Sequence, residues 1–416
     1  MIPEPKARIA PSAFLLFVAV YAIQGVVVAY FFNFNALYME SANPPVTRET
    51  IGWVQTLATI PLMIKFLGGP ISDRFNLLGW GHRKPYIVLG LVIQGLGLVG
   101  LSRIDPGRHL AGFATAGLGT VLGLALYDTC CDGMILEVTP SGDRQRVQGA
   151  LVASRFLATT ACSWGFGHWL ARVGNGPGRG DGVLWVCAGL TLVPLALALW
   201  VREPARAKAQ DDGGFRWEAL RVLLRPRALV LLAFGALYSV VSYGVEINLS
   251  LFYGSLRFGA GAVGDFASAR YLGRAAGASL LPLAATRLGR RPVLLLGVLA
   301  LAATTAGQTL VGGGGSAGAW GAGFGMANGW LDALFCVLAM EASDPRLAAS
   351  TYALFMAVSN VGAAGGGFFS SGVAALGGKY RPVFLLAAAL TLPCLAMTRT
   401  LALLAPKPER PDDLAE

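Results

Sequence analysis

Residues 69–85, GPISDRFNLLGWGHRKP, form a basic turn between two long apolar runs, and residues 286–292, TRLGRRP, form a second basic turn later in the chain. Each turn follows the second apolar run of a group of six. Because the same kind of turn recurs at the same point of both groups, the sequence predicts two related six-helix units. Internal repeats of this kind are typical of transporters.

The composition indicates a membrane protein. The chain has 416 residues, of which 55% are hydrophobic and 13% are charged, whereas soluble domains carry about 25% charged residues. Its apolar runs are mostly about 20 residues or longer, which is enough to cross roughly 30 Å of hydrocarbon as a helix. The sequence therefore predicts twelve transmembrane helices, at residues 12–33, 49–72, 85–103, 111–137, 147–171, 182–201, 228–254, 262–286, 292–311, 317–341, 348–372 and 381–404.

The same runs predict the domain organisation. We expect an N-terminal six-helix bundle over residues 1–201, a cytoplasmic linker over 202–227, a C-terminal bundle over 228–405 and a cytoplasmic tail over 406–416. Lys and Arg are concentrated in the loops on the side of the N-terminus and the linker, so the positive-inside rule places both termini in the cytoplasm. The net charge of +10 follows from this topology, and we expect no nucleic-acid partner.

The first apolar run bears on the location of the protein. Residues 12–33 extend well past the length of a signal peptide and lack a small-residue cleavage site. We interpret this run as a retained first helix, and the protein as a multi-pass protein of the cell (inner) membrane.

Ionisable residues inside the predicted helices are the main functional signal. A charge in the hydrocarbon region costs at least about 2.5 kcal/mol, so such residues usually pair or face a polar cavity. They fall on predicted helices 2, 4, 5, 7, 8 and 10, and none falls on helices 3, 6, 9 or 12. This pattern is expected of a transporter whose inner helices line a cavity. The candidate substrate or coupling residues are Lys65, Asp128, Asp132, Arg155, Glu246, Arg270, Arg274 and Asp332.

Four of these residues are expected at a similar depth in the first half. Asp128 and Asp132 are spaced i, i+4 and share a helix face, and two neighbouring acids disfavour double ionisation, so one of them is expected to take a proton. Lys65 and Arg155 oppose that effect. Two interpretations remain open: an ion-pair network that locks three helices together, or a relay for protons or substrate.

The other four lie in the second half. Glu246 and Arg270 are both roughly 25 Å from the cytoplasmic helix ends, where they are expected to pair as a gate on the extracellular side. Arg274 is expected nearer the midplane. It suits either an anionic group of a substrate or an ion pair with Asp332 or Glu246.

Weaker candidates complete the site prediction. Polar residues of this kind more often form helix-to-helix hydrogen bonds than line a cavity, and His168 is expected at the membrane interface. No metal-ligand spacing, nucleotide-binding motif or nucleophile–base pair occurs, so we expect no metal, no cofactor and no enzymatic activity. The weaker cavity-lining candidates are Gln24, Tyr127, Tyr238, Tyr243 and Asn360.

The first basic turn resembles the loop 2–3 signature of the major facilitator superfamily. Gly69, Asp73 and Arg74 match that signature, and Gly81-His82-Arg83-Lys84 follows after an insertion. The second turn has Thr286 where the signature has an acid. The resemblance implies that Gly69, Asp73, Arg74, Arg83 and Lys84 form a gating motif that braces the cytoplasmic side.

Two groups within this superfamily show a similar insertion. Ile64-Lys65-Phe66-Leu67 and Arg83-Lys84-Pro85-Tyr86 are similar to the folate–biopterin transporters. The run Tyr127-Asp128-Thr129-Cys130-Cys131-Asp132 and the run Ser350-Thr351-Tyr352-Ala353-Leu354 are similar to the muropeptide permease and acetyl-coenzyme A transporter group. The resemblance thus implies substrates that are organic anions.

Together these features predict an all-α membrane protein with the major facilitator fold, twelve transmembrane helices in two six-helix bundles, acting as a monomer. Helices 1, 4, 7 and 10 are expected to face the cavity, with helices 2, 5, 8 and 11 flanking it. The expected function is secondary active transport, with proton-coupled uptake of an organic anion of the pterin/folate, muropeptide or siderophore class. Two alternatives stand beside it: proton-antiport efflux of amphipathic compounds, and a non-transporting membrane assembly factor. A closed, dry centre in which every intramembrane charge is paired would favour the assembly factor.

Overall fold

The structure is a computed structural model that describes residues 9–65, 72, 81–139, 144–203, 224–343, 348–365 and 367–403. The described residues form helices and contain no strand. The predicted gating residues Gly69, Asp73 and Arg74 lie outside the described residues, as do most of the expected linker and the expected tail.

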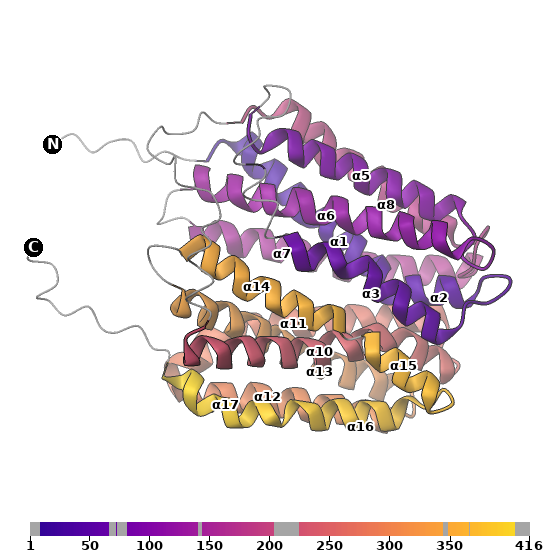
Figure 1. Cartoon of the computed structure of the whole chain (residues 1–416). Helices are drawn as coiled ribbons and strands as arrows, with labels where there is room; N and C mark the ends of the chain where they lie inside the picture. Colours follow the sequence, from indigo (N-terminus) through magenta and orange to yellow (C-terminus); the bar gives the residue numbers. More distant parts are fainter. Residues whose placement is uncertain are drawn as a thin grey trace, which may run out of the picture.

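Long helices run side by side through the molecule (Figure 1). The helices of the first half lie together, and those of the second half lie together beside them (Figure 1). The first half comprises α1 (Pro11–Asn33), α2 (Asn35–Glu40), α3 (Arg48–Ile64), α5 (Lys84–Arg103), α6 (Leu110–Val138), α7 (Arg144–Val173) and α8 (Asp181–Trp200). The second half comprises α10 (Pro226–Ser255), α11 (Ala260–Leu288), α12 (Arg290–Gly307), the 3₁₀ turn η3 (Gln308–Leu310), α13 (Gly314–Ala342), α14 (Ala348–Gly365), α15 (Gly367–Ala375), α16 (Tyr380–Thr391) and α17 (Pro393–Ala402).

Among the described residues, nine helices are long and apolar enough to cross a membrane. The predicted helices missing from this set are α3, α7 and α11, and all three carry or border intramembrane charges. α3 is described only up to its C-terminal neighbour Lys65. α7 and α11 have 30 and 29 residues, so each is about 45 Å long, but their arginines lower the hydropathy. α11 packs mainly against α7 and α13, and protein neighbours there take the place of lipid.

The two halves meet closely at one end of the molecule, which we call the far end. It is the end where α7 finishes and α11 begins. There a Cβ atom on Gly264 would lie 2.5 Å from the carbonyl oxygen of Ser163, and one on Gly167 would lie 2.7 Å from Gly264 Cα. The absence of side chains on these glycines lets α7 and α11 touch backbone to backbone.

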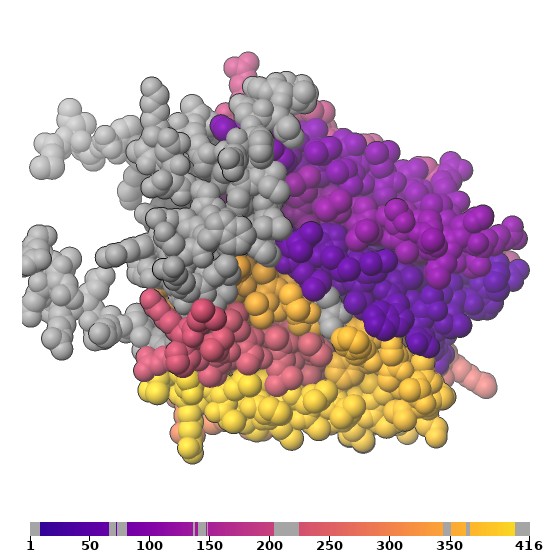
Figure 2. Space-filling view, in the orientation of Figure 1, coloured from indigo at the N-terminus to yellow at the C-terminus, as the bar shows by residue number. Residues whose placement is uncertain are grey.

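A second contact closes the far end from the other side. A Cβ atom on Gly52 of α3 would lie 2.4 Å from Ser370 Cβ of α15. The guanidinium of Arg48 lies 5.4 Å from the ring centroid of Tyr380. In Figure 2 the indigo surface of α3 meets the orange surface of the last third of the chain along this seam. The far end of the described structure is therefore closed.

Two residues of the predicted gating motif, Arg83 and Lys84, begin α5. The Glu203 carboxylate accepts hydrogen bonds from the backbone N–H groups of His82, Arg83 and Lys84 at 3.0, 3.1 and 2.9 Å. Lys84 Nζ also donates to the carbonyl oxygen of Leu199 at 2.9 Å. A carboxylate at a helix N-terminus is stabilised by the unpaired N–H groups there, so this contact ties the start of α5 to the end of α8.

Candidate functional site

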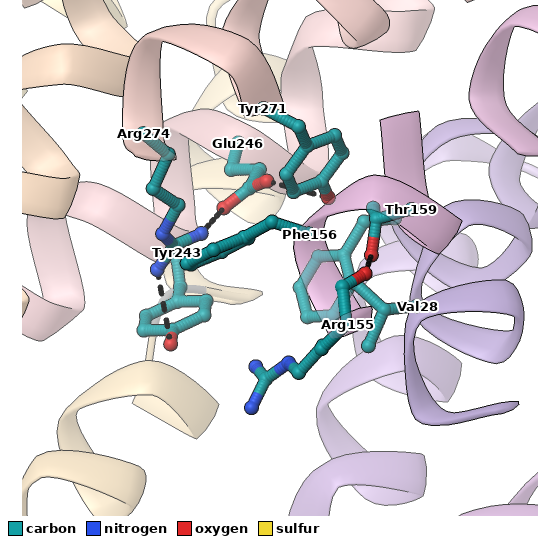
Figure 3. Close-up of a pocket in the computed structure, with 9 residues that line it drawn as sticks. Val28, Arg155, Phe156, Thr159, Tyr243, Glu246, Tyr271 and Arg274 are labelled. Atoms are coloured by element: carbon teal, nitrogen blue, oxygen red, sulfur yellow. Dashed lines mark hydrogen bonds and ion pairs between the residues drawn. The ribbon is translucent and has the colours of Figure 1, made fainter. Parts of the chain in front are cut away.

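A small cavity lies between the two halves, near the middle of the helices that line it (Figure 3). Its volume is about 30 Å³, which is room for a water molecule or two. It is lined from α1, α7, α10 and α11 by Val28, Phe32, Arg155, Phe156, Thr159, Tyr243, Glu246, Tyr271 and Arg274. Predicted helices 1, 5, 7 and 8 thus line it, and helices 4 and 10, which were expected to face the cavity, contribute none of its described lining residues.

Arg274 is the most heavily bonded side chain at the cavity. Its Nη2 and Nε lie 2.6 and 2.9 Å from Asp332 Oδ2, and its Nη1 lies 3.2 Å from Glu246 Oε2. Nη2 also donates to the hydroxyl of Tyr243 at 3.3 Å. Both predicted partners of Arg274, Asp332 and Glu246, therefore contact it at once.

Glu246 is shared between two arginines. Its Oε1 lies 3.4 Å from Arg270 Nε and accepts a hydrogen bond from the Tyr271 hydroxyl at 2.9 Å, while its Oε2 faces Arg274. Only 2% of Glu246 is exposed. Because both arginines lie on α11 and Glu246 lies on α10, the expected Glu246–Arg270 gate joins two helices of the same half and does not span the two halves.

Arg270 also makes a contact that spans the two halves, to Asn33, a residue that the sequence analysis did not select. Arg270 Nη2 donates to Asn33 Oδ1 at 2.5 Å. The Asn33 amide donates in turn to Ala29 O at 2.8 Å and to Ser163 Oγ at 3.2 Å. Asn33 is the last residue of α1, and an amide side chain at the end of a long apolar run is the signal by which the sequence could have indicated it.

The first-half cluster is organised differently. Lys65 Nζ lies 2.9 Å from Asp128 Oδ2, and Gln24 Nε2 donates to Asp128 Oδ1 at 2.7 Å. Asp132 accepts a hydrogen bond from the Tyr21 hydroxyl at 2.6 Å and has no cation within ion-pair distance among the described residues. Asp128 is therefore the paired acid, and Asp132 is held by a neutral donor.

Arg155 does not join this network by direct contact, contrary to the expected four-residue ion cluster. In the described part of the chain its side chain makes neither an ion pair nor a hydrogen bond. Figure 3 shows its guanidinium extending toward the side of the cavity where Tyr243 lies. Equal depth in the bilayer did not place it beside the acids, because α7 turns this residue toward the second half.

The weaker candidates mostly hold helices together. Tyr127 donates to Gln94 Oε1 at 2.9 Å inside the first half, and Tyr238 reaches Asp332 Oδ1 at 3.4 Å. Asn360 donates to the carbonyl oxygen of Leu62 at 2.9 Å, which links α14 to α3. His168 lies 3.0 Å from Asp265 Oδ1, which joins α7 to α11 at the far end.

Long helices packed in two groups, with an ionic centre between them, define an all-helical membrane protein. The family model of the Major Facilitator Superfamily matches residues 9–264. This match covers more than half of the chain, and the chain belongs to that superfamily. It is a transporter rather than an enzyme.

Solved structures share the fold across nearly the whole chain. The nucleoside transporter NupG is similar with a TM-score of 0.74 and 13% identity, over 94% of this chain and 99% of that one; a mutant of it gives 0.75 and 14% over the same shares. A bacterial homologue of the human lysosomal transporter Spinster, inward-facing and unoccupied, gives 0.70 and 17%, over 95% and 98%. At these identities the likeness shows the fold alone. No curated protein sequence matches the chain.

Proposed function

We propose that this chain is a secondary active transporter that takes up an organic anion together with protons by alternating access. The observation that carries the proposal is Arg155. It is a cation at the central cavity that lacks an ion partner among the described residues, and it lies with Arg274 on the lining of the same cavity. A guanidinium cannot lose its proton in a protein, so an anionic group of a substrate is the natural partner for it.

Arg274 would supply the second contact to the anion. Two nitrogen atoms of its guanidinium already contact one carboxylate oxygen, Asp332 Oδ2, and guanidinium groups bind carboxylates and phosphates well. An incoming anion would compete with Asp332 for this guanidinium. The Asp332 side chain is 29% exposed and the Arg274 side chain 9%, so the acid has room to move while the arginine stays in place.

Proton coupling would use the first-half acids. The eight intramembrane ionisable residues are four cations and four acids, so the set is neutral when all are ionised. If Asp132 takes up a proton, the set carries one positive charge, which the anionic substrate neutralises. Asp132 suits this role because its described partner is the Tyr21 hydroxyl rather than a cation.

The arrangement argues against a non-transporting assembly factor. Such a protein is expected to pair every intramembrane charge. Here Asp132 and Arg155 lack ion partners in the described part of the chain, although the far end is closed. The closed far end instead fits one state of an alternating-access cycle, in which the bundles at residues 1–201 and 228–405 rock about the cavity and enlarge it for the substrate.

The substrate class follows from the two arginines. The similarity of fold to the nucleoside transporter NupG does not imply the same substrate. An uncharged nucleoside gives neither Arg155 nor Arg274 an ionic partner. An organic anion of the pterin/folate, muropeptide or siderophore class does. We also propose that the protein acts as a monomer in the inner membrane with both termini in the cytoplasm, as the distribution of Lys and Arg indicates.

Transport by purified protein in proteoliposomes tests the proposal. A panel of organic anions, nucleosides and amphipathic cations is first screened by thermal shift, and each hit is then followed as a radiolabelled solute. We expect an anion to exchange by counterflow and to accumulate when the outside is made acidic. Binding of amphipathic cations with accumulation only under the reverse gradient would replace uptake with efflux, and no exchange by any hit would contradict transport.

A further inference from the structure

A continuous line of polar side chains connects the central cavity to the contact between the two halves. Glu246 binds Arg274 with one carboxylate oxygen and faces Arg270 with the other. Arg270 then crosses to the first half and donates to Asn33 at 2.5 Å. Glu246, Arg270 and Asn33 are each at most 3% exposed. One carboxylate and one guanidinium therefore lie between the cavity and the far end.

Asn33 is oriented as an acceptor by contacts within its own half. Its Nδ2 donates to Ala29 O of α1 and to Ser163 Oγ of α7, which leaves its Oδ1 facing Arg270. Ser163 also belongs to the glycine contact, because its carbonyl oxygen lies where a Cβ atom of Gly264 would be. Separation of α7 from α11 would thus draw Arg270 away from Asn33. The buried guanidinium keeps its charge and would need a new acceptor.

We propose that Asn33 and Arg270 form a latch that holds the far end closed, and that Glu246 transmits occupancy of the cavity to this latch. An anion that binds Arg274 in place of Asp332 also competes with Glu246 for that guanidinium. Glu246 then turns its charge fully to Arg270, and the hydrogen bond from Arg270 to Asn33 weakens. The relay through Glu246 rests on the proposed function, whereas the latch itself requires no substrate.

The chain offers a matched control for Asn33 in Asn248. Both are buried asparagines at 2% and 1% exposure, and both donate to the carbonyl oxygen four residues earlier at 2.8 Å. Asn248 accepts a hydrogen bond from Ser370 Oγ at 3.1 Å, and that partner belongs to its own half. Substitution at Asn248 therefore removes a comparable buried amide without changing the α7–α11 contact, since its partner Ser370 belongs to the separate seam with Gly52 of α3.

The latch is tested by the accessibility of a thiol placed in the closed seam. Ala260, at 5% exposure, lies where α11 touches Gly167 of α7. Ala260→Cys is made in the full-length protein with its six native cysteines replaced, and its labelling rate by a polar maleimide is measured in proteoliposomes. We expect Asn33→Leu to raise this rate about tenfold or more, since a hydrogen bond to a charged group is lost. Asn248→Leu should leave it unchanged. A folded Asn33→Leu protein that labels at the parent rate, or an equal rise in Asn248→Leu, would overturn the latch.

A second variant keeps the test decisive if Asn33→Leu does not fold. Asn33→Asp places a carboxylate opposite Arg270 and strengthens the contact. Labelling of the thiol should become several-fold slower than in the parent. Labelling at the parent rate or faster contradicts the latch.

The relay is tested by non-additivity. Glu246→Gln removes the charge that competes for Arg270 and should slow labelling in the parent background. It should have no further effect when combined with Asn33→Leu, because the latch through which it acts is gone. Equal effects in both backgrounds would remove Glu246 from the relay. None of these measurements uses substrate. The result for the latch can therefore be interpreted even if the transport proposal fails.

Discussion

The two charged clusters of this transporter stabilise their intramembrane charges in different ways. In the second half, Asp332, Arg274, Glu246 and Arg270 form an unbroken line of ion pairs, with the Glu246 and Arg270 side chains only 2% and 3% exposed. In the first half one ion pair, Lys65–Asp128, is more open, at 27% and 12%. The remaining acid there is held by a hydroxyl.

This difference distinguishes a cluster whose charges are held in place from one that contains an acid able to exchange a proton. A carboxylate shared by two buried guanidiniums is needed for both charges, so its loss leaves them uncompensated. An acid that faces a tyrosine can gain or lose a proton without stranding a counter-ion. Under the proposed function, we therefore expect the second-half cluster to stabilise the fold and bind the ligand, and the first-half cluster to transfer the proton. The predictions below test this division.

The largest effect is expected at the shared acid. Glu246→Leu leaves Arg270 and Arg274 without a common counter-charge in a buried site, and should destabilise the protein by about 3–5 kcal/mol. The detergent-solubilised protein should show a much lower melting temperature or fail to accumulate. Asp132→Leu is the matched substitution in the other cluster and should cost far less. Equal losses of stability in Glu246→Leu and Asp132→Leu would contradict the proposed distinction between the two clusters.

Arg155→Ala should abolish most transport while changing stability little. The side chain has no ion partner in the described structure, so its removal leaves no carboxylate without its counter-ion. Counterflow in proteoliposomes measures the transport loss, and melting temperature measures the stability. A variant that transports and folds like the wild type would show that Arg155 neither binds substrate nor supports the fold.

Arg274→Lys should weaken substrate binding about tenfold, close to 1.4 kcal/mol, with the fold retained. Lysine keeps the charge but loses the planar fork that holds a carboxylate through two nitrogen atoms. Asp332→Asn should have the opposite effect on affinity, because it removes the competing acid. Calorimetry with the substrate found by screening gives both values. Unchanged affinity in the two variants would leave Arg274 as a structural contact only.

Asp132→Asn should have the smallest effect on the folded protein and a selective effect on function. An amide can accept the hydrogen bond from the Tyr21 hydroxyl but cannot take up and release a proton. Accumulation of substrate driven by a pH gradient should therefore disappear. Counterflow, which needs no net proton movement, should continue. If both activities persist, the coupling proton is carried elsewhere, and Asp128→Asn is then expected to show the selective loss.

The sequence by itself determined the class of protein, the positions of its helices and the set of intramembrane charges. Hydropathy and helix length are local properties, so the predicted apolar runs correspond closely to the observed helices, including α3, α7 and α11, whose charges lower their hydropathy. The pairing of Arg274 with Asp332 was one of the alternatives that the sequence left open, beside Glu246 and an anionic group of a substrate.

The tertiary structure alone decided which charges meet. Depth along a helix can be counted from the sequence, but the direction in which a side chain points depends on how each helix is rotated against its neighbours. That rotation turned Arg155 away from Asp128 and Asp132 and toward the cavity, and it gave Arg270 a partner in Asn33 across the two halves. The glycines between α7 and α11 let these helices approach backbone to backbone at the far end, near the contact of Arg270 with Asn33.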